Sequence, residues 1–142
     1  MRVLFDTNII LDLFLDRLPF ADDAADLWQA NIDGRLEGFV SAITPVNLFY
    51  IARRLKDRPT AFQAVSELLA AMPVCAVDQT TLQIALTLPF TDYEDAVQHA
   101  SATGNGIAAI VTRNAKDFSG ATVPILSPAE LLAQLPAQSS KE

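Results

Sequence analysis

The chain has 142 residues, of which 51% are hydrophobic and 19% are charged, and its formal net charge is −7. This length suits one domain with a real core, and the composition is that of a globular rather than a disordered protein. No apolar stretch approaches the roughly 18 residues of a membrane span, and acidic residues interrupt the N-terminal apolar segment where a signal peptide would be apolar. The single cysteine, Cys75, excludes an intramolecular disulfide and is expected to be a small buried side chain. These features predict a cytoplasmic protein without a membrane segment.

Short apolar runs alternate with helical patterns along the chain, which is typical of an α/β domain. The runs expected to form strands cover residues 3–5, 38–41, 74–77, 107–111 and 123–126. The run at 107–111 is apolar without alternation, as in a parallel sheet covered on both faces. Pro124 places the last strand at an edge. We therefore expect a single domain over residues 1–134, with a central parallel sheet of about five short strands flanked by helices, and a loose tail over 135–142.

Four helix starts carry residues that commonly cap helices. Each precedes an apolar helical run, and they are Thr44 (followed by Pro45), Asp78, Thr91 and Ser127. The pair Thr91 and Glu94 has the spacing of a capping box, and Ser127 and Glu130 have it too. A capping box gives Glu94 a sufficient structural role.

The first stretch that suggests chemistry is Asp6-Thr7-Asn8, which follows a buried apolar run. In an open α/β sheet, ligands bind beyond the carboxyl ends of the strands, where Asp6 is expected to lie. A helix N-cap is the alternative role for Asp6. A phosphatase with Asp6 as covalent nucleophile is a further alternative, but such enzymes usually have a second acid two residues later, where this chain has Asn8.

A second stretch brings two acidic side chains to one face of a helix. Asp92 and Asp95 are three residues apart, and His99 lies one turn beyond Asp95. Two like charges on one face disfavour each other unless a cation or a raised pKa compensates them. A solvated acidic helix end is the alternative. His99 is expected to pack or to form hydrogen bonds rather than to bind a metal.

A third stretch follows the strand at 107–111, where Thr112, Asn114 and Asp117 would emerge beside Asp6 if the two strands are neighbours. Turn chemistry is the alternative for these side chains. Clustered hard oxygen ligands select Mg²⁺ or Mn²⁺, which can activate a water and stabilise an in-line phosphoryl displacement. The three stretches together favour metal-dependent hydrolysis of a phosphodiester.

Positive charge is concentrated in one segment. Four of the ten basic residues fall within six positions, and they are Arg53, Arg54, Lys56 and Arg58. Such a patch can contact nucleic-acid phosphates even in an acidic protein. The alternative is a solvated helix end whose basic residues complement the helix dipole.

The three stretches, read as Asp6-Thr7-Asn8, Asp95-Ala96 with Ala100, and Thr112-Arg113-Asn114 to Asp117-Phe118, resemble the PIN domain. The nearest similarity is to the small ribonuclease toxins of bacterial toxin–antitoxin pairs, the VapC type, over roughly residues 1–134. The resemblance implies a parallel sheet flanked by helices and an endoribonuclease that depends on Mg²⁺ or Mn²⁺. It also implies a homodimer and a cognate antitoxin that masks the site.

Carried over by position, the resemblance assigns Asp6 as the first acidic ligand and Asp95 as the third. Asp117, or the position of Asn114, corresponds to the last one. Asn8, Asn47, Thr112 and Asn114 are expected near the substrate or behind the ligands, and the four basic residues of the cluster near RNA.

The second acidic residue of the family is normally a glutamate in a pattern like Ser-x-x-Thr-x-x-Glu. Here the pattern reads Ser41, Thr44 and Asn47, so a neutral carbonyl oxygen stands in place of a charge. Asp92, close to Asp95, is the candidate that makes up this charge. The departure predicts that Asn47→Glu raises metal affinity and RNA cleavage. It also leaves open an alternative function, a catalytically weakened PIN-like module that binds RNA or a protein partner.

Overall fold

The structure, a computed structural model, describes residues 1–137 and is built on one parallel sheet of five strands in the order β3-β2-β1-β4-β5. The strands are β1 (Arg2–Phe5), β2 (Glu37–Ser41), β3 (Val74–Cys75), β4 (Ala109–Val111) and β5 (Ile125–Leu126). The predicted α/β class, the parallel sheet and the five strand positions are confirmed. Strand β5 lies at an edge of the sheet, as Pro124 predicts.

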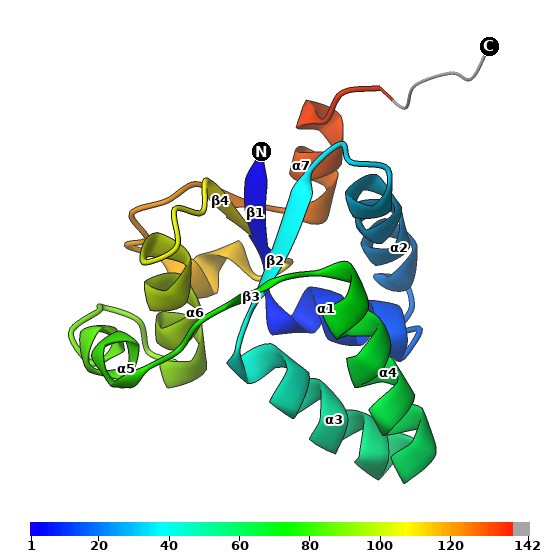
Figure 1. Cartoon of the computed structure of the whole chain (residues 1–142). Helices are drawn as coiled ribbons and strands as arrows, with labels where there is room; N and C mark the ends of the chain where they lie inside the picture. The colour runs from blue at the N-terminus through cyan, green and yellow to red at the C-terminus, as the bar shows by residue number, and fades with distance from the viewer. Residues whose placement is uncertain (138–142) are drawn as a thin grey trace.

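Helices cover both faces of this sheet (Figure 1). They are α1 (Thr7–Phe14), α2 (Ala21–Ile32), α3 (Ile43–Leu55), α4 (Arg58–Ala71), α5 (Gln79–Ala85), α6 (Tyr93–Thr103) and α7 (Pro128–Gln134), with a 3-10 helix, η1 (Ala115–Phe118), after β4. Helices α3 and α4 lie side by side as a helical hairpin at one end of the molecule (Figure 1). Among the described residues, no helix combines the length and the apolar character that crossing a bilayer requires.

The two faces of the sheet bury alternate residues of each strand. Val3 and Phe5 of β1 belong to a core shared with α1, α2, α4 and α7, whereas Leu4 points to the opposite face and packs with Ile110 and Phe118. Cys75 is buried on the face of Leu4, as expected. This burial on both faces explains why the strands are apolar without alternation.

The carboxyl edge of the sheet is fixed by the pairing of β1 with β4. Phe5 is in register with Val111, so the next residues, Asp6 and Thr112, leave the sheet side by side. In Figure 1 the carboxyl ends of β1 and β2 point toward the starts of α1 and α3. The predicted neighbourhood of the two strands is therefore confirmed.

Two predicted helix starts are wrong and two are right. Asp78 and Ser127 cap α5 and α7, and Ser127 forms the expected capping box with Glu130. Helix α3 begins at Ile43 with Ala42 as its N-cap, and the Thr44 hydroxyl hydrogen bonds to the Thr7 hydroxyl at 2.8 Å rather than to the helix end. Pro45 is tolerated there because the first turn of a helix has no use for its missing N–H.

Helix α6 begins one residue later than the predicted capping box requires. Asp92, not Thr91, is its N-cap, and the Asp92 carboxylate accepts a hydrogen bond from the Asp95 amide at 3.1 Å. Glu94 is therefore not the partner of Thr91, and its side chain is free for another role. The last predicted segment, the tail, begins at the C-cap of α7, and its residues 138–142 lie outside the described residues.

Candidate active site

Acidic side chains from three parts of the chain line one pocket at the carboxyl edge of the sheet. The pocket has a volume of about 330 Å³, and its carboxylates are Asp6, Asp92, Glu94, Asp95 and Asp117. Asn8 and Asn47 also line it, and no lysine or arginine does among the described residues. The structure thus places the four predicted acidic ligands around one space and adds a fifth carboxylate, Glu94.

Asp6 is held in place by neutral hydrogen-bond donors. It is 3% exposed, Gln98 Nε2 donates to its Oδ1 at 3.0 Å, and Thr112 Oγ1 donates to its Oδ2 at 2.7 Å. Asp6 occupies the N-cap position of α1, but its side chain makes no capping hydrogen bond. The alternative role of Asp6 as a capping side chain is therefore wrong, and its carboxylate is oriented by groups that leave its charge uncompensated.

Gln98 is a residue that sequence reasoning missed. Its side chain is fully buried, and its Oε1 accepts a hydrogen bond from the Thr7 amide at 3.1 Å while its amide group holds Asp6. The available signal was its position, three residues after Asp95 and so on the same face of α6. Gln98 joins α6 to the β1–α1 turn.

Asp95 has a strongly perturbed acidity. Burial raises the pKa of Asp95 from 3.8 to about 7, with further contributions from the carboxylates of Asp6, Asp92, Asp117 and Glu94. Asp92, by contrast, is exposed and caps α6 through its bond to the Asp95 amide. The raised pKa follows from grouping carboxylates in a partly desolvated pocket that no lysine or arginine of the described residues lines.

Glu94 enters the same pocket from the first turn of α6. Asn47 on α3 donates a hydrogen bond from its Nδ2 to Glu94 Oε2 at 2.5 Å, and both side chains are half-buried. Burial raises the pKa of Glu94, the Asn47 hydrogen bond opposes that rise, and the charges of Asp6 and Asp92 add to it. Sequence reasoning assigned Glu94 to a capping box and missed this contact.

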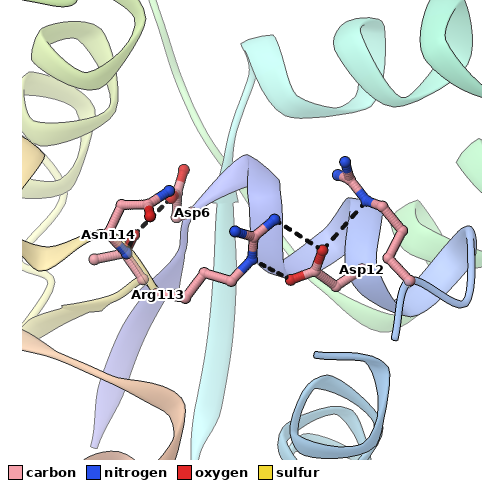
Figure 2. Close-up of polar contacts among 6 residues, drawn as sticks. Asp6, Asp12, Arg113 and Asn114 are labelled. Carbon is pink, nitrogen blue, oxygen red and sulfur yellow. Dashed lines mark hydrogen bonds and ion pairs between the residues drawn. The ribbon is translucent and has the colours of Figure 1, made fainter. Parts of the chain in front are cut away.

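The segment after β4 contributes differently at each position. Thr112 is buried, and its hydroxyl accepts a hydrogen bond from the Asn114 amide at 3.0 Å while it donates to Asp6. Asp117, on η1, is exposed and reaches the pocket, whereas Asn114 precedes η1 and is not among the lining residues. Figure 2 shows Asn114 beside Asp6.

A second buried carboxylate, Asp12 on α1, sits in the opposite electrostatic setting. Arg113 binds both its oxygens, from Nε at 2.7 Å and from the terminal nitrogen at 3.2 Å, and Arg17 Nε approaches it at 3.2 Å. The Arg113 guanidinium also lies 4.0 Å from the centroid of the Phe20 ring. Figure 2 shows Arg113 reaching from the end of β4 to Asp12, away from Asp6. Arg113 therefore ties β4 to α1 and leaves the pocket without its charge.

The predicted basic cluster lies at the far end of the α3–α4 hairpin. Arg53 and Arg54 are in the last turn of α3, Lys56 is its C-cap, and Arg58 opens α4; all four are exposed. Arg54 follows Asn47 by seven residues, so it lies on the face of α3 that borders the pocket, about two turns further on. Arg53 and Arg58 border a hollow with Tyr50 and Phe62, and Arg53 and Arg54 together border another beside Tyr50.

His99 is buried and plays the structural role that its sequence position predicts. Its Nε2 accepts a hydrogen bond from the Thr122 amide at 3.0 Å, and its ring packs edge-on against Phe90. Burial lowers the pKa of His99 and so favours the neutral ring.

The pocket offers oxygen donors of the kind that Mg²⁺ and Mn²⁺ prefer. Within residues 1–137, no group of three His, Cys, Asp or Glu side chains is already arranged to ligate one ion. Like charges move apart when nothing neutralises them, and the exposed Asp92 and Asp117 have room to do so. By the chemistry of its donors the pocket fits a hard divalent cation, whose ligands have to close around it.

Comparison with known proteins gives a family and several similar folds. A family model described as PIN domain matches residues 2–116 of the chain. A toxin–antitoxin complex from Klebsiella pneumoniae has a chain with 24% identity and a TM-score of 0.67, over 89% of this chain and 97% of that one. A chain of VapBC2 from Rickettsia felis, bound to a DNA fragment from its promoter, has 14% identity and a TM-score of 0.70, over 89% of this chain and 98% of that one.

A third similar structure is Mycobacterium tuberculosis VapC20, described as a Sarcin-Ricin loop cleaving toxin. It shares 16% identity with a TM-score of 0.64, over 76% of this chain and 86% of that one. A search of curated protein sequences finds no match to the chain. The structural similarities establish the fold, and the family model establishes the family.

Proposed function

The chain belongs to the PIN domain family, and from that premise we propose that it is an endoribonuclease that depends on Mg²⁺ or Mn²⁺. The observation that carries the proposal is the pocket at the carboxyl edge of the sheet, where carboxylates gather without a basic residue to neutralise them. Asp6, Asp95 and Asp117 are the proposed ligands and catalytic residues, with Asp92 beside them. The alternative, a phosphatase with Asp6 as covalent nucleophile, lacks its usual second acid, because Asn8 stands two residues after Asp6.

The bound cation supplies charge stabilisation for the phosphate and a water of lowered pKa as nucleophile. The residues of the chain prepare the site for it. Gln98 and Thr112 fix both oxygens of Asp6, which removes the conformational freedom that a ligand would otherwise lose on binding. Asn8 and Asn47 border the same pocket and offer neutral polar groups to a ribose or a phosphate.

The exposed arginines of the α3–α4 hairpin support RNA as the substrate. They give a protein of net charge −7 a local surface for phosphates. Arg54 is the best placed of the four, because it continues the face of α3 that carries Asn47 toward the pocket. An RNA strand that follows this face would pass the hairpin before its scissile phosphate reaches the carboxylates.

The similar structures suggest the biological setting. They include chains of VapBC and other toxin–antitoxin complexes, so we extend the proposal to the toxin of such a pair, with an antitoxin partner and a homodimeric assembly. Light scattering of the purified chain measures the assembly directly. Co-purification with the product of an adjacent small gene tests the partner.

A second candidate function is a PIN-like module that binds RNA without cutting it. It is favoured by Asn47, a neutral side chain at the position where the family normally has an acidic ligand, and by the net charge of −7. The two candidates differ in one assay, cleavage of a generic single-stranded RNA against Mn²⁺ concentration. The nuclease produces fragments that depend on Mn²⁺, and the binding module retards the RNA without cutting it.

The test of the nuclease compares the parent with Asp6→Asn and with Asp26→Asn, a matched change on the exposed surface of α2. We expect cleavage by the parent and by Asp26→Asn, no cleavage by Asp6→Asn, and none by any of them in EDTA. Equal cleavage by the parent and Asp6→Asn would show that a contaminating nuclease or another site is responsible.

A further inference from the structure

Asn47 and Glu94 meet in the pocket from two different helices. They are 47 positions apart in the sequence, and the hydrogen bond from Asn47 Nδ2 to Glu94 Oε2 is 2.5 Å long. Asn47 is on α3 and Glu94 is in the first turn of α6, so the contact joins two elements that both border the pocket. A carboxylate has about four acceptor positions on two oxygens, and this hydrogen bond uses one of them.

The structure of α6 gives Glu94 no other task. The N-cap is Asp92, and the capping hydrogen bond runs to Asp95, so Glu94 is not needed to complete the helix end. A first-turn glutamate whose side chain lay in solvent would interact with the helix dipole just as favourably as the half-buried Glu94 does. Its half-buried carboxylate instead accepts the hydrogen bond from Asn47 at the wall of the pocket. The Asn47 amide is a neutral partner and leaves the charge in place.

We propose that Glu94 is a further ligand of the divalent cation, and that Asn47 is a positioning residue that holds the Glu94 carboxylate toward the pocket. The proposal rests on the proposed function of the same pocket. It differs from the sequence-based expectation, in which Asn47 leaves a charge missing and Asp92 replaces it. Glu94 on α6 then supplies, across the same contact, the negative charge that Asn47 on α3 lacks.

Asp92 is a poorer source of the missing charge. It is exposed, and one of its oxygens accepts the capping hydrogen bond from the Asp95 amide. Asp92 also lines the pocket, but a cation would have to use its Oδ2 or share Oδ1 with the helix cap. Glu94 is half-buried and already faces the pocket, so it can bind a cation without giving up a helix-capping bond.

This arrangement reverses the expected effect of a substitution at position 47. In Asn47→Glu, a second carboxylate lies within hydrogen-bond distance of Glu94, and the two charges repel each other. The hydrogen bond that orients Glu94 is also lost. The single substitution therefore lowers cation affinity, whereas the exchange Asn47→Glu with Glu94→Gln restores one acid and one amide across the same contact.

The experiment measures Mn²⁺ affinity of the full chain by electron paramagnetic resonance, before any RNA is added. The variants are the parent, Glu94→Gln, Asn47→Glu, the double exchange, and Glu67→Gln as the matched control. Glu67 is exposed on α4 and accepts a hydrogen bond from Gln63 at 3.1 Å, so its substitution makes the same chemical change away from the pocket. Circular dichroism of each variant shows whether the fold is retained.

We expect Glu94→Gln to lower the affinity at least as much as loss of an outer-sphere partner does, roughly 10- to 100-fold. Asn47→Glu also lowers it, Glu67→Gln leaves it unchanged, and the double exchange recovers most of the loss. Parent affinity in folded Glu94→Gln overturns the inference, and so does a gain of affinity in Asn47→Glu. If the expected pattern of Mn²⁺ binding appears but the parent cuts no RNA, the ligand assignment stands and the nuclease function fails.

Discussion

Two buried aspartates, Asp6 and Asp12, lie six residues apart on the β1–α1 segment and meet opposite electrostatic surroundings. They are 3% and 0% exposed. Asp12 is neutralised by the guanidinium groups of Arg113 and Arg17, whereas the hydrogen-bond donors to Asp6 are neutral. Figure 2 shows the two carboxylates on either side of the strand end. The two guanidinium groups of this region therefore neutralise Asp12, and the pocket of Asp6 keeps an excess of negative charge.

The difference separates a structural carboxylate from a functional one. A buried charge that is paired with an opposite charge inside the protein is already neutralised, so it does not require a bound ion. A group of half-buried carboxylates with no counter-charge is costly in the free protein, and a bound cation removes that cost. The predictions below test this contrast, first at Asp12 and then at Asp95.

The largest expected effect is on stability in Asp12→Asn. The substitution leaves Arg113 and Arg17 without their anion, and breaking a buried pair in this way costs about 3 kcal/mol or more of the free energy of unfolding. Urea denaturation followed by circular dichroism measures it. Asp16→Asn is the control, because Asp16 is exposed and its φ of 52° is one that asparagine also adopts. Equal loss in both variants would show that the ion pairs do not stabilise the fold.

The second prediction has the opposite sign. In EDTA at pH 8, Asp95→Asn should raise the stability, because it removes one charge from the group of carboxylates. Asp95 is half-exposed, so after solvent screening we expect a gain of about 1 kcal/mol, or roughly 3–5 °C in Tm for a domain of this size. Differential scanning calorimetry measures it. A lower Tm than the parent would mean that the Asp95 charge is compensated within the protein.

The third prediction concerns pH. The pKa of Asp95 is about 7 in the folded chain and 3.8 is its ordinary value, so between these values the folded state binds more protons than the unfolded state. The contribution of Asp95 to stability is therefore present at low pH and is lost as pH rises through about 7. In EDTA, the Tm difference between Asp95→Asn and the parent should grow from pH 5 to pH 8. A constant difference across this range would contradict the raised pKa.

The smallest expected effect concerns the hairpin arginines. Each lost phosphate contact lowers the log–log salt dependence of single-strand RNA binding by about 0.7. We expect this decrease for Arg54→Ala, which lies on the face of α3 that borders the pocket, and a larger one for the double substitution of Arg53 and Arg54. Filter binding at several salt concentrations measures the slope. Unchanged slopes would assign these residues to helix-end electrostatics or to a protein partner.

The sheet could be predicted from the sequence because its signal is local. Phe5 and Val111 end apolar runs without alternation, and such runs form strands covered on both faces. The placement of Asp6 and Asp117 at one edge follows once these strands are neighbours, and the resemblance to the PIN domain added Asp95. The features that depend only on the position of a residue relative to a strand end or a helix end can therefore be predicted from the sequence.

The other features could not be predicted, because the sequence allows two equally good helix caps or gives no local signal for a distant contact. Thr91 and Asp92 are adjacent and both cap helices well, and the use of Asp92 shifts the helix by one residue and frees Glu94 from its predicted capping box. Asp12 and Arg113 are 101 positions apart, so no spacing rule pairs them. Gln98 likewise reaches Asp6 across 92 positions. Contacts of this kind require the tertiary structure.

The central claim is that the carboxylates around Asp6 and Asp95 form a divalent-cation site that cuts RNA. The most direct measurement is Mn²⁺ titration of the parent, Asp95→Asn and Asp26→Asn, with cleavage of a single-stranded RNA followed in the same samples. We expect saturable Mn²⁺ binding and matching cleavage in the parent and in Asp26→Asn, and a loss of both in folded Asp95→Asn. Undiminished Mn²⁺ binding and cleavage by Asp95→Asn would contradict the claim.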